Sequence, residues 1–141
     1  KILAVDGLEG NLDALKRLFA EEPYEIVTAR TAEDALEIAR TERPDVAILE
    51  VRQPGVDGFD LCRKLRESIR TSKMSIVFTS GEQANASDAV EALDVGGCDY
   101  IAKPFEAEEL RARVRAVLRV RSEHEQDLET TRTITRRLAK P

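Results

Sequence analysis

Hydrophobic residues gather in five short runs along the chain, and between these runs they recur at helical spacing. The runs cover residues 2–5, 25–29, 46–49, 76–78 and 100–102. Each run has the length of a β-strand. Because the runs are continuously apolar rather than alternating with polar residues, we expect strands that are buried on both faces, as in a parallel sheet covered by helices.

Helical spacing is clearest in the first two intervening stretches. The apolar positions there are Leu12, Leu15, Leu18 and Phe19, followed by Ala35, Leu36, Ile38 and Ala39. Thr31 precedes Asp34 by three residues, an arrangement close to a capping box, and Pro44 marks the end of the second helix.

A third helix is predicted after Asp57 and Gly58, which indicate a turn. Its inward-facing positions are expected to be Phe59, Leu61, Cys62 and Leu65. Strand and helix therefore alternate five times along the chain. This alternation predicts an α/β fold with a doubly wound, five-stranded parallel sheet.

The composition indicates one globular domain and excludes several classes of protein. The chain has 141 residues, 42% of them hydrophobic, and its formal net charge of −5 argues against nucleic-acid binding. No apolar run approaches the ~20 residues that cross a bilayer, so we expect a cytoplasmic protein without a membrane partner. Cys62 and Cys98 lack the spacing of a disulfide framework or a zinc site, and we expect both to be small core residues.

Four polar residues stand at the ends of predicted strands. Asp6 follows the first strand, Glu50 the third, Thr79 the fourth and Lys103 the fifth. In doubly wound sheets, ligands bind at the carboxyl ends of the strands near a topological switch point, so we expect these residues to converge. Two acids can ligate Mg²⁺, and a hydroxyl with an ammonium can hold phosphoryl oxygens.

Residues 1–120 resemble the receiver domain of two-component response regulators. Ile2-Leu3-Ala4-Val5-Asp6-Gly7 resembles the family's first strand and acidic pair, and residues 46–50 with Pro54-Gly55-Val56-Asp57-Gly58 resemble its phosphoacceptor strand and loop. The resemblance implies a flavodoxin-like, CheY-like (βα)5 fold. It also implies that Thr79 is the switch hydroxyl, Tyr100 the switch aromatic, and Lys103, before Pro104, the phosphate-binding lysine. A backbone carbonyl of Arg52 would ligate Mg²⁺, and a histidine kinase or another signalling protein would be the partner.

Two positions depart from the family pattern. Gly7 stands where the resemblance implies the principal Mg²⁺-binding acid, so Mg²⁺ binding by Asp6, Glu50 and the Arg52 carbonyl is expected to be weak or absent. Glu50 stands at the phosphoacceptor position in place of aspartate, and a displacement of about 1 Å in a reacting group can cost ~100-fold in rate. We therefore predict a degenerate receiver that is not phosphorylated in the ordinary way and is not an enzyme.

Two interpretations of Glu50 stay open. Its carboxylate could reach Lys103 and Thr79 and imitate part of the phosphorylated state, or it could pair with Lys103 or Arg52 and hold one fixed conformation. One alternative function is a conventional Mg²⁺-dependent receiver in which Glu50 still accepts phosphate. Another is a phosphohydrolase on the same fold with Asp6 as nucleophile, which would need a second acid nearby and more chain to enclose a substrate.

From Glu106 onward the chain predicts one long helix, because neither proline nor glycine occurs before Pro141. Alternating steps of four and three give a weak coiled-coil seam with five apolar positions in nine: Leu110, Val114, Val117, Arg121, His124, Leu128, Thr131, Thr135 and Leu138. Residues 121–141 would be a linker or coiled coil to an output domain or dimer partner, or a solvated tail. We expect the chain to be part of a longer protein.

Two features of this tail invite functional interpretations that we do not favour. His124, the only histidine, is expected at an exposed helical position rather than in a catalytic site. The arginines of residues 111–121 share their helix with acids and have no aromatic residues beside them, so a helix surface is a simpler interpretation than a nucleic-acid site.

Overall fold

Five parallel strands form the central sheet of the computed structural model, which describes residues 1–53, 56–81 and 86–139. The strands are β1 (Ile2–Val5), β2 (Ile26–Ala29), β3 (Val46–Glu50), β6 (Ser75–Thr79) and β7 (Asp99–Ile101), in the order β2-β1-β3-β6-β7. Every neighbouring pair is parallel. The predicted strands are confirmed to within one residue at each end. The strand order reverses between β1 and β3, which makes that boundary the topological switch point.

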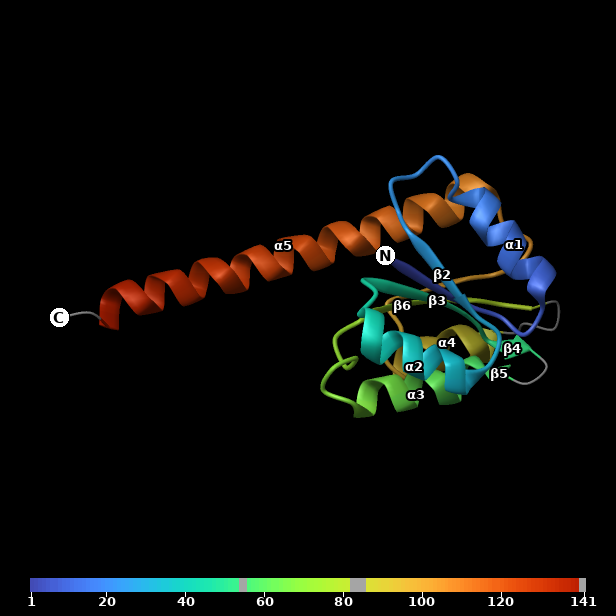
Figure 1. The fold of residues 1–141 in the computed structure, drawn as a ribbon, viewed down its shortest axis with the longest axis horizontal. Coiled ribbons are helices and arrows are strands. Elements are labelled where there is room, and N and C mark those ends of the chain that lie inside the picture. The colour runs from blue at the N-terminus through green and yellow to red at the C-terminus, as the bar shows by residue number, and fades with distance from the viewer. Residues whose placement is uncertain (54–55, 82–85, 140–141) are drawn as a thin grey trace.

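Helices cover both faces of this sheet (Figure 1). The helices α1 (Glu9–Leu18) and α5 (Ala107–Ala139) lie on one face, and α2 (Ala32–Glu42), α3 (Gly58–Glu67) and α4 (Ala86–Asp94) lie on the other. The arrangement is the predicted doubly wound α/β fold. The three central strands are buried along their whole length, whereas the edge strands β2 and β7 are mostly half-buried.

The apolar faces of the helices form two clusters, one on each side of the sheet. One cluster joins α2, α3 and α4 to the sheet through side chains that include Ala35, Ala39, Leu61, Cys62, Leu65 and Ala92. The other joins α1 and α5 through Phe19, Leu110 and Val114, with Leu15 and Val117 packed against them. The inward positions predicted for the third helix are confirmed, since all four are buried.

The prediction for the second cysteine is wrong. Cys62 is buried in α3, where its thiol donates to the carbonyl of Val95 at 3.4 Å, but Cys98 is exposed. Cys98 precedes the edge strand β7, and its backbone N–H donates to the Ile76 carbonyl at 2.7 Å. Its backbone is therefore hydrogen-bonded to β6 while its side chain lies at the surface.

Local hydrogen bonds account for the predicted starts of α2 and α3. The Thr31 hydroxyl accepts from the Asp34 N–H at 3.1 Å, as an N-cap does. The Asp57 carboxylate accepts from the N–H groups of Phe59 and Asp60 at 2.9 and 3.2 Å. At the end of α2, Arg43 adopts the left-handed conformation with φ 47°, directly before Pro44.

A small hairpin that the sequence did not predict lies between β3 and α3. It consists of β4 (Arg52–Gln53) and β5 (Val56–Asp57), which pair antiparallel. Gly58 follows directly, and a Cβ at this position would lie 2.4 Å from the carbonyl oxygen of Glu50. Only glycine therefore allows the start of α3 to approach the end of β3 so closely. Pro54 and Gly55 of the predicted loop lie outside the described residues.

The helix α5 continues well beyond the sheet (Figure 1). Its contacts with the body extend to Arg121, whose guanidinium donates to the carbonyls of Asp45 and Lys73, both at 3.1 Å. Farther along, Ile134 and Leu138 are exposed. The side chains of His124 and Leu128, two predicted seam positions, lie outside the described part. Among the residues that the structure describes, no helix is long and apolar enough to span a membrane.

Candidate functional site

The four predicted site residues lie together at the carboxyl edge of the sheet. Asp6 directly follows β1, Glu50 and Thr79 are the last residues of β3 and β6, and Lys103 lies just beyond β7. Glu50 is in register with Thr79, which in turn is in register with Ile101 of β7. The predicted convergence is therefore found, and it lies beside the switch point of the sheet.

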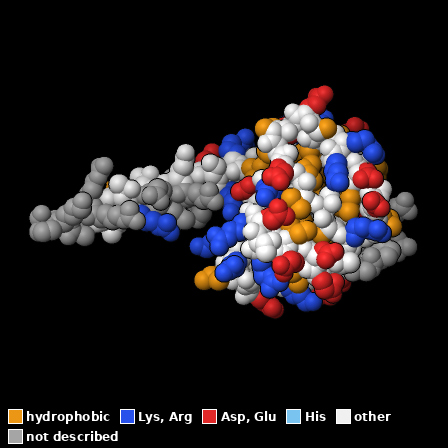
Figure 2. Space-filling view, viewed as in Figure 1, with side chains coloured by type: hydrophobic (Ala, Val, Ile, Leu, Met, Phe, Trp, Pro, Cys, Tyr) orange, Lys and Arg blue, Asp and Glu red, His pale blue; other side chains and the backbone are white. Residues whose placement is uncertain are grey.

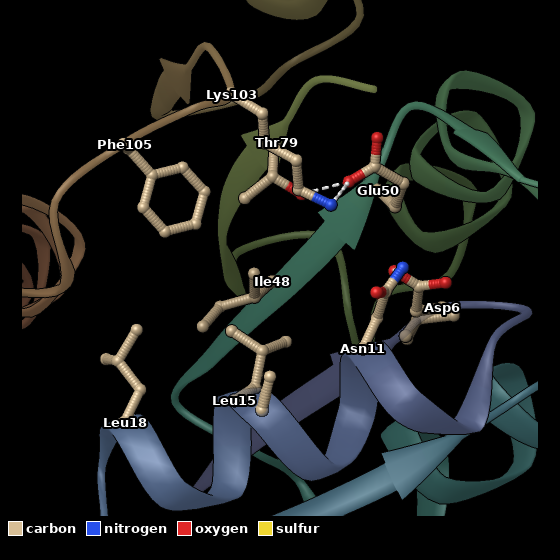
Figure 3. A pocket seen from close by; sticks show the side chains of 11 residues that line it. Asp6, Asn11, Leu15, Leu18, Ile48, Glu50, Thr79, Lys103 and Phe105 are labelled. Atoms are coloured by element: carbon tan, nitrogen blue, oxygen red, sulfur yellow. Dashed lines mark hydrogen bonds and ion pairs between the residues drawn. The ribbon is translucent and has the colours of Figure 1, made fainter. Parts of the chain in front are cut away.

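Glu50 is the centre of this group. Its side chain is buried, with 1% of its surface exposed. Its Oε2 atom accepts a hydrogen bond from the Thr79 hydroxyl at 2.6 Å and lies 2.8 Å from the Lys103 ammonium (Figure 3). One carboxylate oxygen thus receives both the hydroxyl and the cation. The other, Oε1, is buried without a hydrogen-bond partner among the described residues.

Arg52, the other cation considered for Glu50, pairs with a different acid. Its guanidinium forms two hydrogen bonds with the Asp88 carboxylate, at 2.8 and 2.7 Å. Asp88 is buried in the first turn of α4, whereas the Arg52 side chain is about half exposed. The pairing of Glu50 with Arg52 is therefore wrong, and the pairing with Lys103 is found. The bidentate geometry of a guanidinium with a carboxylate explains the preference.

Asp6 accepts hydrogen bonds from residues at the start of α1. One carboxylate oxygen accepts from the Leu8 N–H at 2.9 Å, and the other accepts from the Asn11 side-chain amide at 3.0 Å. Burial of the Asp6 side chain, only 2% exposed, strengthens these hydrogen bonds. The sequence pointed to Asp6 as a ligand and did not reveal these two hydrogen bonds.

A cation lies beside Gly7, where the family pattern has its second acid. The Arg30 guanidinium, at the end of β2, donates to the Gly7 carbonyl through Nε at 3.4 Å and Nη2 at 3.3 Å. It also lies 3.8 Å from the carboxylate of Glu9. Arg30 could not be found from the sequence, because only the strand order shows that β2 ends next to β1.

These residues do not fit a Mg²⁺ site. Within residues 1–53, 56–81 and 86–139, no three acidic, histidine or cysteine side chains are grouped so that they could hold a metal. Both Asp6 oxygens already accept hydrogen bonds, Gly7 offers no side chain, and Arg30 adds a positive charge. The Arg52 carbonyl oxygen and Glu50 Oε1 lie 3.8 and 3.3 Å from the position that a Cβ of Gly81 would take. Mg²⁺ in proteins keeps several waters and is held by one or two carboxylates. Here Glu50 is already paired with the Lys103 ammonium, and Asp6 has no second acid beside it.

The neighbouring loops place two further polar groups. The Ser80 hydroxyl accepts from the Lys103 N–H at 2.9 Å, whereas the adjacent Thr79 hydroxyl donates to Glu50. The peptide bond between Lys103 and Pro104 is cis. Tyr100 packs against the cluster of α2, α3 and α4, and its hydroxyl is buried with no hydrogen-bond partner within the described structure.

A cavity of about 270 Å³ opens beside these residues, on the side of α1. Its lining includes apolar side chains from α1 and β3 that sequence periodicity had assigned to the core. Periodicity identifies the face of a helix that turns inward, but it cannot show whether the facing side chains meet. The cavity therefore could not be predicted from the sequence pattern and is known only from the packing of α1 on the sheet.

Comparison with known proteins identifies the family of this chain. Residues 2–115 match the family model described as the response regulator receiver domain. The match covers more than half of the chain, and it agrees with the five-stranded sheet and with the group of residues at its carboxyl edge. The chain belongs to the response regulator receiver family of two-component systems.

Curated relatives extend beyond the length of this chain. The transcriptional regulatory protein AfsQ1 of Streptomyces coelicolor is 36% identical over 118 residues, which are 84% of this chain and 51% of the relative. The response regulator PleD of Caulobacter vibrioides is 35% identical over 119 residues, 84% of this chain and 26% of the relative. The chain thus spans about half or less of the length of these relatives.

Solved structures share the same fold. A two-component response regulator from Clostridium difficile aligns with a TM-score of 0.75 and 33% identity, covering 84% of this chain and 94% of that one. A CheY-like receiver domain from Methanospirillum hungatei aligns with a TM-score of 0.79 and 26% identity, covering 87% and 96%. The flavodoxin-like, CheY-like fold implied by the sequence is confirmed.

Proposed function

We propose that this receiver passes its signal without ordinary phosphorylation, because Glu50 occupies the contacts that a phosphoryl group would make. The observation that carries the proposal is the pair of contacts on Glu50 Oε2, from the Thr79 hydroxyl and the Lys103 ammonium. These are the two donors that the sequence assigns to phosphoryl oxygens. In a receiver with a free acceptor they are available for the phosphoryl group, and here a carboxylate of the chain itself holds both.

The imitation of the phosphorylated state is partial. A phosphoryl group carries about −1.5 to −2 charges and three acceptor oxygens. The glutamate supplies one charge, and only one of its two oxygens accepts a hydrogen bond in the described structure. We infer that Glu50 draws the Thr79 hydroxyl and the Lys103 ammonium together, but supplies less negative charge than a phosphoryl group would. The buried hydroxyl of Tyr100 supports this state, since the proposed switch aromatic is already packed inward.

The site favours this function over the two alternatives. A conventional receiver would need Mg²⁺, and we propose that Mg²⁺ binding is weak or absent because Asp6 is engaged with α1 and Arg30 lies over Gly7. A phosphohydrolase would need a free Asp6 nucleophile with a second acid beside it. Receiver domains are in general signalling modules rather than enzymes, and we propose the same for this chain.

A phosphoryl mimic tests the proposal. The measurement follows backbone amide shifts around Glu50, Thr79 and Lys103 by NMR while Mg²⁺ and beryllofluoride are added. The unmodified protein should show no saturable shift, whereas the Gly7→Asp, Glu50→Asp double variant should regain one. The two single variants serve as matched controls, since each restores only one of the altered groups. A saturable, Mg²⁺-dependent shift in the unmodified protein would overturn the proposal in favour of a conventional receiver.

Receiver domains interact with histidine kinases and with output domains, and we propose that α5 makes the output connection here. Arg113 of α5 pairs with Asp99 of β7 at 3.2 Å, so the helix is tied to the strand that ends beside Lys103. Beyond Arg121, we propose that residues 121–139 form a coiled coil with a second copy or an output helix, using exposed apolar residues such as Leu138.

Sedimentation of the purified chain tests the self-association. If the second copy is the partner, the chain should sediment as a concentration-dependent dimer, and Leu138→Lys should shift it toward the monomer. Gln126→Lys places the same charge at an exposed position outside the predicted seam and should leave the dimer intact. A monomer at all concentrations would exclude the homodimer and leave the output helix as the partner.

A further inference from the structure

The cavity beside Glu50 has two unlike ends (Figure 3). Apolar side chains from α1, from β3 and from the segment after β7 line one end: Leu15, Leu18, Ile48 and Phe105. Polar side chains line the other: Asp6, Asn11, Glu50, Thr79 and Lys103. The polar end belongs to the receiver site, but the apolar end extends away from it beneath α1.

The apolar end can accept a hydrophobic group. Leu15, Leu18 and Phe105 are only half-buried, although all three pack against the cluster that joins α1 and α5. An apolar group that entered the cavity would remove this remaining surface from water, which is the dominant favourable term in binding such ligands. The volume of about 270 Å³ lies just below the usual range for ligand pockets, about 300–1,000 Å³, so the ligand would be small.

The side chains that line the polar end carry more negative than positive charge, and Arg30, which donates to the Gly7 carbonyl, is not part of this lining. Asp6 and Glu50 contribute two buried carboxylates against the single ammonium of Lys103. The Thr79 hydroxyl already donates its hydrogen bond to Glu50, and the Asn11 side-chain amide donates one of its hydrogen bonds to Asp6. A ligand that carries a positive charge and donates hydrogen bonds complements such an end, whereas an anion meets two carboxylates.

We propose that this cavity binds a small protonated amine with an apolar body. The ammonium lies at the carboxylates of Asp6 and Glu50, and the apolar body lies against Leu15, Ile48 and Phe105. A bare divalent cation would leave the apolar end of the cavity unused. The proposal concerns binding alone, so it stands whether or not Glu50 imitates a phosphoryl group.

A matched series of small molecules tests the class of ligand. The probes are 2-phenylethylamine, the neutral 2-phenylethanol and the anionic phenylacetate, with methylammonium as the head group alone and Mg²⁺ as a cation without an apolar body. Binding is followed through amide NMR shifts of α1 and of residues around Phe105. The amine should saturate, and the alcohol and the carboxylate should bind about ten- to a hundredfold more weakly, since they lose a hydrogen-bonded charge pair.

Two variants locate the site. Ala14 lines the cavity from an exposed position on α1, so Ala14→Leu should fill the space without unfolding the chain and should weaken the amine severalfold or more. Lys16→Leu places the same side chain on the same helix outside this lining and should preserve binding. Glu50→Gln keeps the shape of the side chain and removes its charge, so the preference for the amine over the alcohol should shrink.

Several results would overturn the proposal. Equal affinities of the amine and the alcohol would show that binding needs no positive charge. Equal affinities of methylammonium and phenylethylamine would show that the apolar end of the cavity contributes nothing to binding. If Mg²⁺ displaced the amine and produced the same NMR shifts, the cavity would be a site for cations in general rather than for an amine with an apolar body. A lack of saturation with every probe would show that the cavity takes no ligand of this class. None of these results depends on beryllofluoride, so a failure here is distinguishable from a failure of the proposed signalling function.

Discussion

Arg52 and Asp88, which are 36 residues apart, join the loop after β3 to the first turn of α4 through two hydrogen bonds of 2.8 and 2.7 Å. Asp88 is 1% exposed, so its carboxylate is removed from water and depends on partners within the chain. This pair holds α4 against the loop that follows Glu50. It also leaves Lys103 as the cation that balances Glu50, which determines how the centre of the site is arranged.

The Arg52–Asp88 pair should contribute measurably to stability. Arg52→Ala leaves the buried Asp88 carboxylate without its guanidinium and should lower the free energy of unfolding by about 1–3 kcal/mol, the usual range for hydrogen bonds to charged groups. Urea unfolding of Arg52→Ala, Asp88→Asn and the double variant measures the coupling between the two residues, which should be about 1 kcal/mol.

A second arginine is a control for this result. Arg63 has two acidic partners, Asp60 and Glu91, but all three side chains are substantially exposed. Arg63→Ala should therefore cost less than about 1 kcal/mol. Equal losses for Arg52→Ala and Arg63→Ala would show that the burial of Asp88 adds nothing to its ion pair.

Lys103 should be essential to the stability of the site. Lys103→Met leaves the Glu50 carboxylate buried with only the Thr79 hydroxyl as a donor and should cost about 2–4 kcal/mol, a little less than a fully buried pair because Lys103 is 30% exposed. Adding Glu50→Gln removes the uncompensated charge and should recover most of this loss. Thermal or urea unfolding compares these variants with Lys64→Met, an exposed control expected to change stability by less than about 0.5 kcal/mol. Failure of the double variant to recover stability would argue against a charged Glu50.

The two cysteines should differ in reactivity. Burial raises the pKa of the Cys62 thiol above its usual value of 9.0, so its nucleophilic thiolate is scarce in the folded protein, whereas Cys98 is exposed. A thiol reagent such as DTNB should therefore modify one cysteine rapidly under native conditions. Cys98→Ser should abolish the rapid phase and Cys62→Ser should preserve it. Rapid modification of both thiols would contradict the burial of Cys62.

The same raised pKa of Cys62 has a consequence for stability. A group with a raised folded-state pKa contributes stability that is fully present below its unfolded pKa and is lost as the pH rises through the folded value. The contribution of Cys62 should therefore be constant up to about pH 9 and decline above it. Comparison of the unfolding free energies of the wild-type chain and Cys62→Ser across this range measures the decline.

Arg121 should anchor the long helix to the body. Its two hydrogen bonds to the carbonyls of Asp45 and Lys73 lie at the point where α5 leaves the sheet. Arg121→Ala should speed amide hydrogen exchange in the turn around residue 121 by about fivefold, which corresponds to the loss of about 1 kcal/mol. Arg119→Ala, at an exposed position one half-turn earlier, should leave exchange unchanged. Unchanged exchange in both variants would show that the helix holds its direction without this anchor.

Basic side chains on the surface of this protein have acidic neighbours. Basic and acidic side chains are interspersed over the face of the body in Figure 2. The arginines of α5 likewise have acidic partners, since Arg111 and Arg115 both contact Glu108, at 3.0 and 2.6 Å. Arg115, followed by Arg111, holds the pKa of the Glu108 carboxyl below its usual range. The interpretation of these arginines as an ordinary helix surface thus agrees with their contacts.

The sequence alone determined the fold and the position of the site. Continuous apolar runs predict buried parallel strands, and residues that follow such strands must meet at one edge of the sheet, because all of the strands run in the same direction. That reasoning placed Asp6, Glu50, Thr79 and Lys103 together before any contact was known. It also identified the cap Thr31 and the turn at Asp57, because these depend only on residues two or three positions away.

Only the tertiary structure decided which groups are partners. Lys103 rather than Arg52 balances Glu50, Arg30 lies over Gly7, and Cys98 reaches the surface. Each outcome depends on side chains far apart in sequence, whose distances are set by the strand order and by the packing of helices on the sheet. The cavity under α1 has the same origin, since a periodic pattern shows which residues face inward but not how completely they fill the space between layers.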